Sequence, residues 1–79
     1  MMLQRYVVQE MLDKKLATLT PREMEVMEKV LQGKLNKVIA AELNVAQRTL
    51  ELHRQKVMQK MQVNNVAELA FLMGKSAEL

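Results

Sequence analysis

The sequence predicts an all-α fold of four helices that follow an additional N-terminal helix. Apolar residues recur at intervals of three and four along most of the 79 residues, which is the period of a helix face. No segment alternates polar and apolar residues as a strand does. We therefore expect a helix within residues 1–18, a small domain over residues 19–74 and a tail over residues 75–79.

Composition excludes several classes of site. The chain has eight methionines, only two aromatic residues and no cysteine. Methionine fills irregular gaps, so we expect it in the core, with a methionine-rich binding groove as the alternative. Without cysteine there are no disulfides, one histidine does not form a zinc site, and we expect no cofactor. No apolar run approaches about 18 residues and no signal-peptide pattern is present, so we expect a cytoplasmic protein without a membrane span.

The N-terminal segment is predicted to be amphipathic. Residues 2–16 contain no helix breaker, and Leu3, Val7 and Met11 recur at every fourth position. Three further apolar residues lie nearby: Tyr6, Leu12 and Leu16. Because a helix cannot bury its apolar face alone, we expect this face to pack on the domain or on a second copy.

The second helix has clear boundary signals. Thr20 suits the N-cap, Pro21 the first helical position, and Glu23 completes a capping box. Gly33 is placed to end this helix in a left-handed conformation.

Two short helices follow, joined by a tight turn. Asn36 is predicted to cap a helix over residues 37–43, and Asn44 to adopt the left-handed turn conformation. Ala46 stands at the next cap position, where alanine is a poor cap, before a helix over residues 47–61.

The last predicted helix covers residues 66–73. Asn64 or Asn65 is expected to cap it, and Gly74 to end it. Residues 75–79 are then expected to fray.

The helix over residues 47–61 separates its side chains by face. At about 100° per residue, Leu50, Val57 and Met61 form one narrow apolar stripe. The opposite side carries polar residues and one leucine, with two charged residues on its flanks: Arg48, Leu52, Gln55, Gln59, Lys56 and Glu51. A helix packed by one stripe that presents Arg, Gln and Lys on the other is the form of helix that reads the major groove.

Positive charge gathers on the same part of the chain. Residues 34–62 carry six basic and two acidic side chains, whereas residues 1–33 carry five of each. Such an excess attracts phosphate. The alternative is an ordinary solvated surface, because the excess is not extreme.

Residues 19–73 resemble the LuxR-type helix-turn-helix domain, the C-terminal output domain of NarL/FixJ-group response regulators. The resemblance depends on motifs that occur in order: Thr20-Pro21-Arg22-Glu23, Gly33, Asn36-Lys37-x-Ile39-Ala40, Thr49-Leu50, His53 and Lys60-Met61. It implies a four-helix domain. Residues 1–16 look like the linker helix to a receiver domain, so we expect either part of a response regulator or a small stand-alone regulator.

Two residues of the turn depart from the family pattern. The family usually has glycine at position 44 and a capping serine at position 46, where this chain has Asn44 and Ala46. Both changes weaken the turn slightly, and neither lies on the face predicted to meet DNA.

The resemblance and the helix periodicity together predict four base-reading residues. Gln55 can pair with adenine, Leu52 can meet a thymine methyl group, and Arg48 can reach a guanine or a phosphate. Glu51 has three open roles: accepting from cytosine, repelling phosphate, or neutral exposure.

Five residues are predicted to contact the DNA backbone. The resemblance implies this role for Thr49, His53 and Lys56, and charge adds Lys37 and Lys60. Arg54 falls on the core-facing side of its helix, so we expect a structural ion pair with a glutamate of an earlier helix.

The last helix is predicted to serve the dimer. In the family this helix makes a two-fold contact, which implies an interface formed by Val66, Leu69, Ala70 and Met73. A homodimer on DNA would place two reading helices about one duplex turn apart.

The predicted function is sequence-specific binding of double-stranded DNA in transcriptional regulation, with RNA polymerase as a candidate partner. The alternative is a protein-interaction module that binds another regulator or RNA polymerase, favoured by Glu51 and Leu52 on the outer face. A sigma-factor region 4 domain is a weaker alternative. We expect no enzymatic activity, because no nucleophile, metal cluster or phosphate loop accompanies His53.

Overall fold

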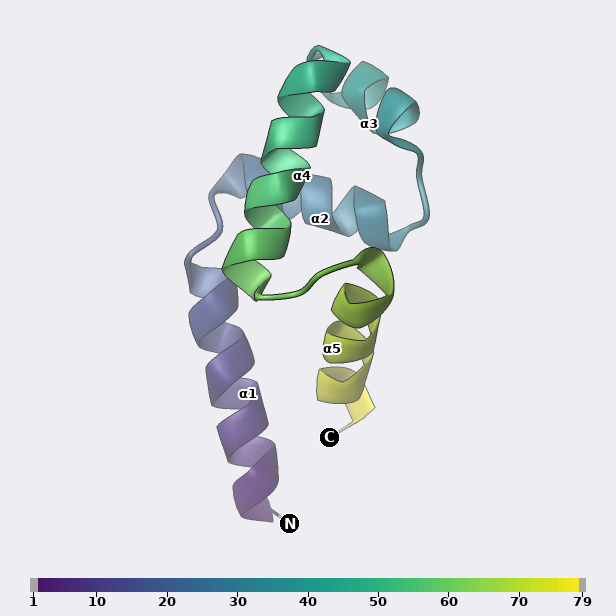
Figure 1. Cartoon of the computed structure of the whole chain (residues 1–79). Helices are drawn as coiled ribbons and strands as arrows, with labels where there is room; N and C mark the ends of the chain where they lie inside the picture. Colours follow the sequence, from purple (N-terminus) through teal and green to yellow (C-terminus); the bar gives the residue numbers. More distant parts are fainter. Residues whose placement is uncertain (1, 79) are drawn as a thin grey trace.

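The all-α prediction is confirmed by the computed structural model, which describes residues 2–78, with side chains for residue 7 and residues 9–74. Five helices make up this part of the chain, and it contains no strand. They are α1 (Met2–Ala17), α2 (Pro21–Leu31), α3 (Asn36–Leu43), α4 (Gln47–Met61) and α5 (Val66–Glu78). In Figure 1, α4 crosses α2, α3 lies at one end of α4, and α1 extends away from its other end.

The predicted start of α2 is confirmed. The Glu23 backbone N–H donates to Thr20 Oγ1 at 3.1 Å, and the Thr20 N–H donates to Glu23 Oε1 at 2.9 Å. Pro21 is the first helical residue. Gly33 follows the helix with φ 82°, a conformation that glycine adopts without steric cost.

The cap predicted for α3 is wrong. Leu35 occupies the N-cap position with no side-chain hydrogen bond, and Asn36 is the first helical residue. Asn36 Oδ1 instead accepts a hydrogen bond from Arg54 Nη1 at 2.7 Å. Because this oxygen bonds a guanidinium on another helix, it does not serve the free amides of its own helix. The glutamate partner expected for Arg54 is therefore replaced by Asn36.

The turn between α3 and α4 forms as predicted. Asn44 lies in the left-handed region at φ 55° and ψ 47°. Ala46 is the N-cap of α4 and makes no side-chain cap hydrogen bond. The left-handed Gln62, at φ 58°, ends α4 and was not anticipated from the sequence.

The last helix starts as predicted but ends later. Asn65 is the cap, because its Oδ1 accepts from the Glu68 backbone N–H at 2.9 Å. The predicted end at Gly74 is wrong, because α5 continues to Glu78. Gly74 does not adopt the positive φ that ends a helix, and glycine within a helix costs only about 1 kcal/mol. Position 79 lies outside the described residues.

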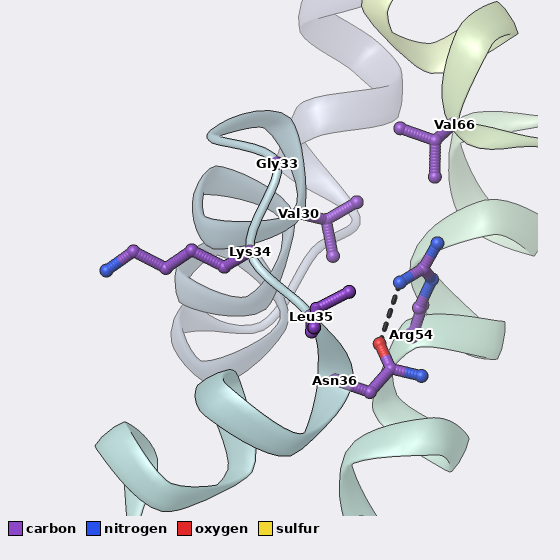
Figure 2. Close-up of a pocket in the computed structure, with 7 residues that line it drawn as sticks. All are labelled: Val30, Gly33, Lys34, Leu35, Asn36, Arg54 and Val66. Carbon is purple, nitrogen blue, oxygen red and sulfur yellow. Dashed lines mark hydrogen bonds between the residues drawn. The ribbon is translucent and has the colours of Figure 1, made fainter.

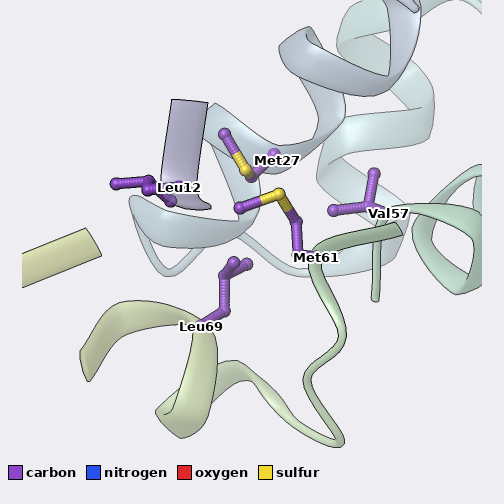
Figure 3. Close-up of a cluster of buried hydrophobic side chains, with 5 residues drawn as sticks. All are labelled: Leu12, Met27, Val57, Met61 and Leu69. Carbon is purple, nitrogen blue, oxygen red and sulfur yellow. The ribbon is translucent and has the colours of Figure 1, made fainter. Parts of the chain in front are cut away.

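Two apolar clusters form the core on either side of the α2–α4 crossing. One joins α1, α2, α4 and α5, and Figure 3 shows its side chains converging: Leu12, Met27, Val57, Met61 and Leu69. The other joins α2, α3 and α4 through Val26, Val30, Ile39, Ala40 and Leu50. Core filling by methionine is thus confirmed at Met27 and Met61.

Part of the apolar surface of α1 packs on the domain, and part of it is exposed in the single chain. Leu12 is buried and Leu16 packs beside it, whereas Val7 and Met11 are exposed. The Leu3 side chain lies outside the described residues. Leu12 and Leu16 form an i, i+4 pair on the side of α1 that meets the domain, and packing of Val7 and Met11 on a second copy stays a prediction.

Ala46→Ser should raise the free energy of unfolding by up to about 1 kcal/mol, because a serine hydroxyl can accept from a free amide of α4. Thermal denaturation measures the effect. Ala41→Ser, at an exposed position inside α3, is the control and should be slightly destabilising. Equal melting temperatures for the two variants would contradict the cap assignment.

Candidate nucleic-acid interface

Helix α4 is held by one side and presents the other to solvent. Leu50, Val57 and Met61 are fully or almost fully buried, as the helix periodicity predicted. The opposite side is exposed along the whole helix, from Arg48 through Leu52, Gln55 and Lys56 to Gln59. This surface, the outer face of α4, is long enough to enter a major groove because 15 residues span about 22 Å.

All four predicted base-reading residues lie on this outer face or its flank. Gln55 is exposed, and the apolar Leu52 is 44% exposed. Arg48 Nη1 and Glu51 Oε2 form a loose i, i+3 ion pair at 3.8 Å, with side chains 79% and 53% exposed. A pair this exposed contributes little to stability, so both groups remain available to a ligand.

Most predicted phosphate contacts lie along one side of α4. Thr49 and Lys56 are exposed and His53 is half-buried, at the i, i+4, i+7 spacing that places residues on one side of a helix. Lys37, near the start of α3, is also exposed. Lys60 continues this row, but its ammonium is engaged: Nζ lies 2.7 Å from Glu23 Oε1 and donates to the Thr18 carbonyl at 3.1 Å.

The Lys60–Glu23 contact ties the end of α4 to the start of α2. Glu23 is a buried charged residue, and one of its carboxylate oxygens accepts from both Lys60 Nζ and the Thr20 amide. The hydrogen bond from Lys60 is the main cause that lowers the pKa of Glu23, and the Thr20 amide adds to it. The local sequence indicates only the capping role of Glu23, because Lys60 lies 37 positions away along the chain.

The middle of α4 is linked to the start of α3 by Arg54. The guanidinium crosses to Asn36 at the start of α3, beside an open pocket of about 460 Å³ that also reaches Val66 of α5 (Figure 2). This charge-assisted hydrogen bond fixes α3 against α4. Arg54 is therefore a structural residue behind the outer face, as its place on the helix predicted.

A third polar contact joins α3 to α2. Lys34 Nζ and Lys29 Nζ lie 2.8 and 2.9 Å from the two oxygens of the Glu42 carboxylate. These hydrogen bonds lower the pKa of Glu42, with Lys34 as the larger cause. The sequence offered no periodic signal for this contact, because its residues come from two helices and the loop between them.

The residues predicted for the dimer contact are divided between core and surface. Leu69 is fully buried within the single chain. Val66 and Met73 are half-buried against the two core clusters, and Ala70 is exposed. Because Leu69 is already part of the core, we leave it out of the surface offered to a second copy.

No helix within residues 2–78 combines the length and apolar character needed to cross a membrane.

Two helices joined by a tight turn, with the second presenting a polar outer face and braced by α2, define a helix-turn-helix DNA-binding domain of the kind found in transcriptional regulators. The chain belongs to the luxR family of bacterial regulatory proteins, which residues 17–73 match. The resemblance drawn from the motifs is thus confirmed.

Two transcriptional regulators are similar to this chain in sequence, and a solved structure is similar to it in fold. The transcriptional regulatory protein FixJ of Bradyrhizobium diazoefficiens is 43% identical over 65 residues, covering 82% of this chain and 32% of FixJ. The tetrathionate response regulatory protein TtrR of Salmonella typhimurium is 49% identical over 65% of this chain and 25% of its own. The crystal structure of full-length FixJ from B. japonicum aligns with a TM-score of 0.86 at 38% identity, over 98% of this chain and 38% of that one. The chain thus spans between a quarter and a third of the curated relatives FixJ and TtrR.

Glu23→Gln should lower the free energy of unfolding near neutral pH by about 1–3 kcal/mol, because it leaves the Lys60 ammonium without its anion. The pKa of Glu23 is lowered in the folded state, so its contribution is present above the usual glutamate range and is lost as pH falls through and below that range. Urea denaturation at a series of pH values measures both effects.

Glu25→Gln, at an exposed position two residues along α2, is the matched control and should change stability little. The difference in the free energy of unfolding between wild type and Glu23→Gln should become smaller at acid pH. A gap that stays constant down to acid pH would show that the Glu23 charge does not stabilise the fold.

Proposed function

We propose that this chain binds double-stranded DNA in a sequence-specific manner, by placing the outer face of α4 in the major groove, and thereby regulates transcription. The observation that carries the proposal is the exposed row of Arg48, Leu52, Gln55 and Gln59 on a helix whose opposite side is fully buried. Such a row offers hydrogen-bond donors and an apolar contact to base edges, on a backbone that cannot rotate away.

Base reading is assigned to Arg48, Glu51, Leu52 and Gln55. The amide of Gln55 matches adenine, the exposed Leu52 matches a thymine methyl group, and Arg48 matches guanine. Glu51 lies within ion-pair distance of Arg48, which supports a role in orienting that guanidinium or in accepting from cytosine.

Backbone contacts are assigned to Lys37, Thr49, His53 and Lys56, which lie on α3 and along one side of α4. These contacts set affinity and register without reading sequence. Lys60 is omitted because its ammonium is bound by Glu23 and the Thr18 carbonyl.

The names of the relatives favour a role for this chain in a signalling protein. TtrR is a response regulatory protein, and the chain matches only part of its length. We propose that the chain acts as the output domain of such a regulator, in the cytoplasm where DNA is accessible, with RNA polymerase as the partner that receives the signal. A small stand-alone regulator is the other form that this domain supports.

Two copies are proposed to bind inverted half-sites. Val66, Ala70 and Met73 of α5 keep some exposure in the single chain and form the surface for the second copy. Selection of bound fragments from a random duplex pool at about 0.1–0.15 M salt tests both points, because non-specific phosphate binding weakens at that ionic strength. An enriched inverted repeat supports DNA reading and the dimer, whereas a folded chain that enriches nothing contradicts the proposed function.

Gln55→Ala and Lys56→Ala should affect DNA binding in different ways. Loss of the Gln55 amide should relax preference at one base position, at about 1–3 kcal/mol, whereas loss of the Lys56 charge should weaken binding to all sequences and reduce the salt slope by about one. Fluorescence anisotropy titrations over a panel of single-base variants and salt concentrations measure both.

The two alanine variants serve as controls for each other, because they are adjacent on α4 and both side chains are exposed. Identical effects on every duplex would overturn the assignment of faces. Charge reversal of Lys37 and Lys56 distinguishes DNA binding from the protein-interaction alternative. The reversed variant should lose DNA binding, and a variant that still binds DNA would refute the assignment of these lysines to phosphates.

A further inference from the structure

The phosphate-facing side of α4 continues beyond the helix-turn-helix unit onto α1. Thr49, His53 and Lys56 form a row along this side, and Lys60 follows at the same spacing. Lys60 Nζ donates to the carbonyl of Thr18, the residue just after α1. The row therefore ends against the last turn of α1, as the approach of α1 to the lower end of α4 in Figure 1 also shows.

A shallow cleft of about 360 Å³ lies at this junction. The described residues that line it are polar or cationic and include no carboxylate: Lys14, Lys15, Thr18, Gln59, Lys60 and Gln62. Gln59 also belongs to the outer face of α4, so the cleft opens beside the surface assigned to DNA. An anion held there would be continuous with a duplex lying on α4.

Two of the three lysines in the cleft keep charge available for an anion. Lys60 is neutralised by Glu23 at 2.7 Å. Lys14 Nζ makes only a loose contact with Glu10 at 3.9 Å, with side chains 78% and 70% exposed. Lys15 takes part in no ion pair among the described residues. An exposed pair such as Lys14–Glu10 contributes little, so a phosphate can replace Glu10.

The nearby acidic groups of α1 do not fill the cleft. Asp13 accepts a hydrogen bond from Gln9 Nε2 at 2.9 Å, one turn towards the N-terminus, and neither Asp13 nor Glu10 lines the cleft. A structural role for Lys14 and Lys15 also exists, since cations in the last turn interact favourably with the helix dipole. That role affects the stability of α1, whereas binding of an anion affects the salt dependence of DNA binding, so the two are separable.

We infer that Lys14 and Lys15, in the last turn of α1, bind backbone phosphates of the duplex next to the base pairs read by α4. Helix α1 is then part of the DNA-binding surface. The inference rests on the proposed function, because it requires a duplex on the outer face of α4.

The test compares the double variant Lys14→Gln/Lys15→Gln with wild type, over about 50 to 200 mM salt, by anisotropy on a selected duplex of about 30 base pairs. Each lost phosphate contact should reduce the salt slope by about 0.9 and cost a few-fold in affinity at low salt. Base preference should stay unchanged, because phosphates carry no sequence information.

Three controls make the result specific. Lys14→Arg/Lys15→Arg keeps both charges and should retain the slope. Lys29→Gln removes one charge at the α2–α3 contact, away from α1, and should leave the slope unchanged. On a duplex trimmed to the base pairs under α4, the double glutamine variant and wild type should bind alike.

Each outcome bears on one proposal. An unchanged slope in the double glutamine variant, with reduction in Lys56→Ala, overturns the role of α1 and leaves the proposed function standing. Failure of wild type to bind any duplex overturns the proposed function itself. A lower melting temperature with wild-type binding assigns Lys14 and Lys15 to the helix dipole alone and overturns the inference.

Discussion

The burial of one side of α4 is the constraint on which the rest of the structure depends. Leu50 belongs to one core cluster, and Val57 and Met61 belong to the other. Each such side chain stabilises the fold by roughly 1.5–3 kcal/mol on burial, which is a large share of the margin of a domain this small. Helix α4 therefore cannot rotate without opening both clusters, and its outer face is fixed in direction.

Polar contacts then set the positions of the neighbouring helices around α4. Arg54, at the middle of α4, bonds Asn36 of α3, and Lys60, near the C-terminal end of α4, bonds Glu23 and the Thr18 carbonyl. Leaving a buried carboxylate unpaired is costly, so the Lys60–Glu23 contact favours one arrangement of helices over its alternatives. Helix α4 is thus anchored at its middle and near its C-terminal end by residues that point away from the outer face.

The separation between residues that hold α4 in place and residues that face solvent explains how a small basic domain can read DNA. The residues that hold α4 do not compete with those assigned to bases, so Gln55 and Leu52 are free to face a groove. Electrostatic attraction comes from a second group, which runs along one side of α4 and, by our inference, onto α1. Membership of the luxR family agrees with this arrangement, because in a helix-turn-helix domain the second helix of the motif enters the major groove.

The sequence by itself determined most of the local structure. The capping box at Thr20 and Glu23, the left-handed Asn44, the bounds of α4 and the separation of its two faces all follow from spacing and side-chain chemistry within a few residues. Helix periodicity also puts Arg48, Leu52 and Gln55 opposite the buried stripe and Glu51 on its flank, and their exposure follows from that spacing.

The tertiary structure decided which partner each polar or apolar group takes. Asn36 accepts a hydrogen bond from Arg54 and does not cap its own helix, and Lys60 forms an ion pair with Glu23. Leu69 belongs to the core, and Leu12 is buried whereas Met11 is exposed. These outcomes depend on residues far apart in the sequence, such as Lys60 and Glu23, which are 37 positions apart and which helix packing alone brings together. Local periodicity gives the direction of a side chain on its own helix, but which residue of another helix contacts that side chain depends on how the helices pack.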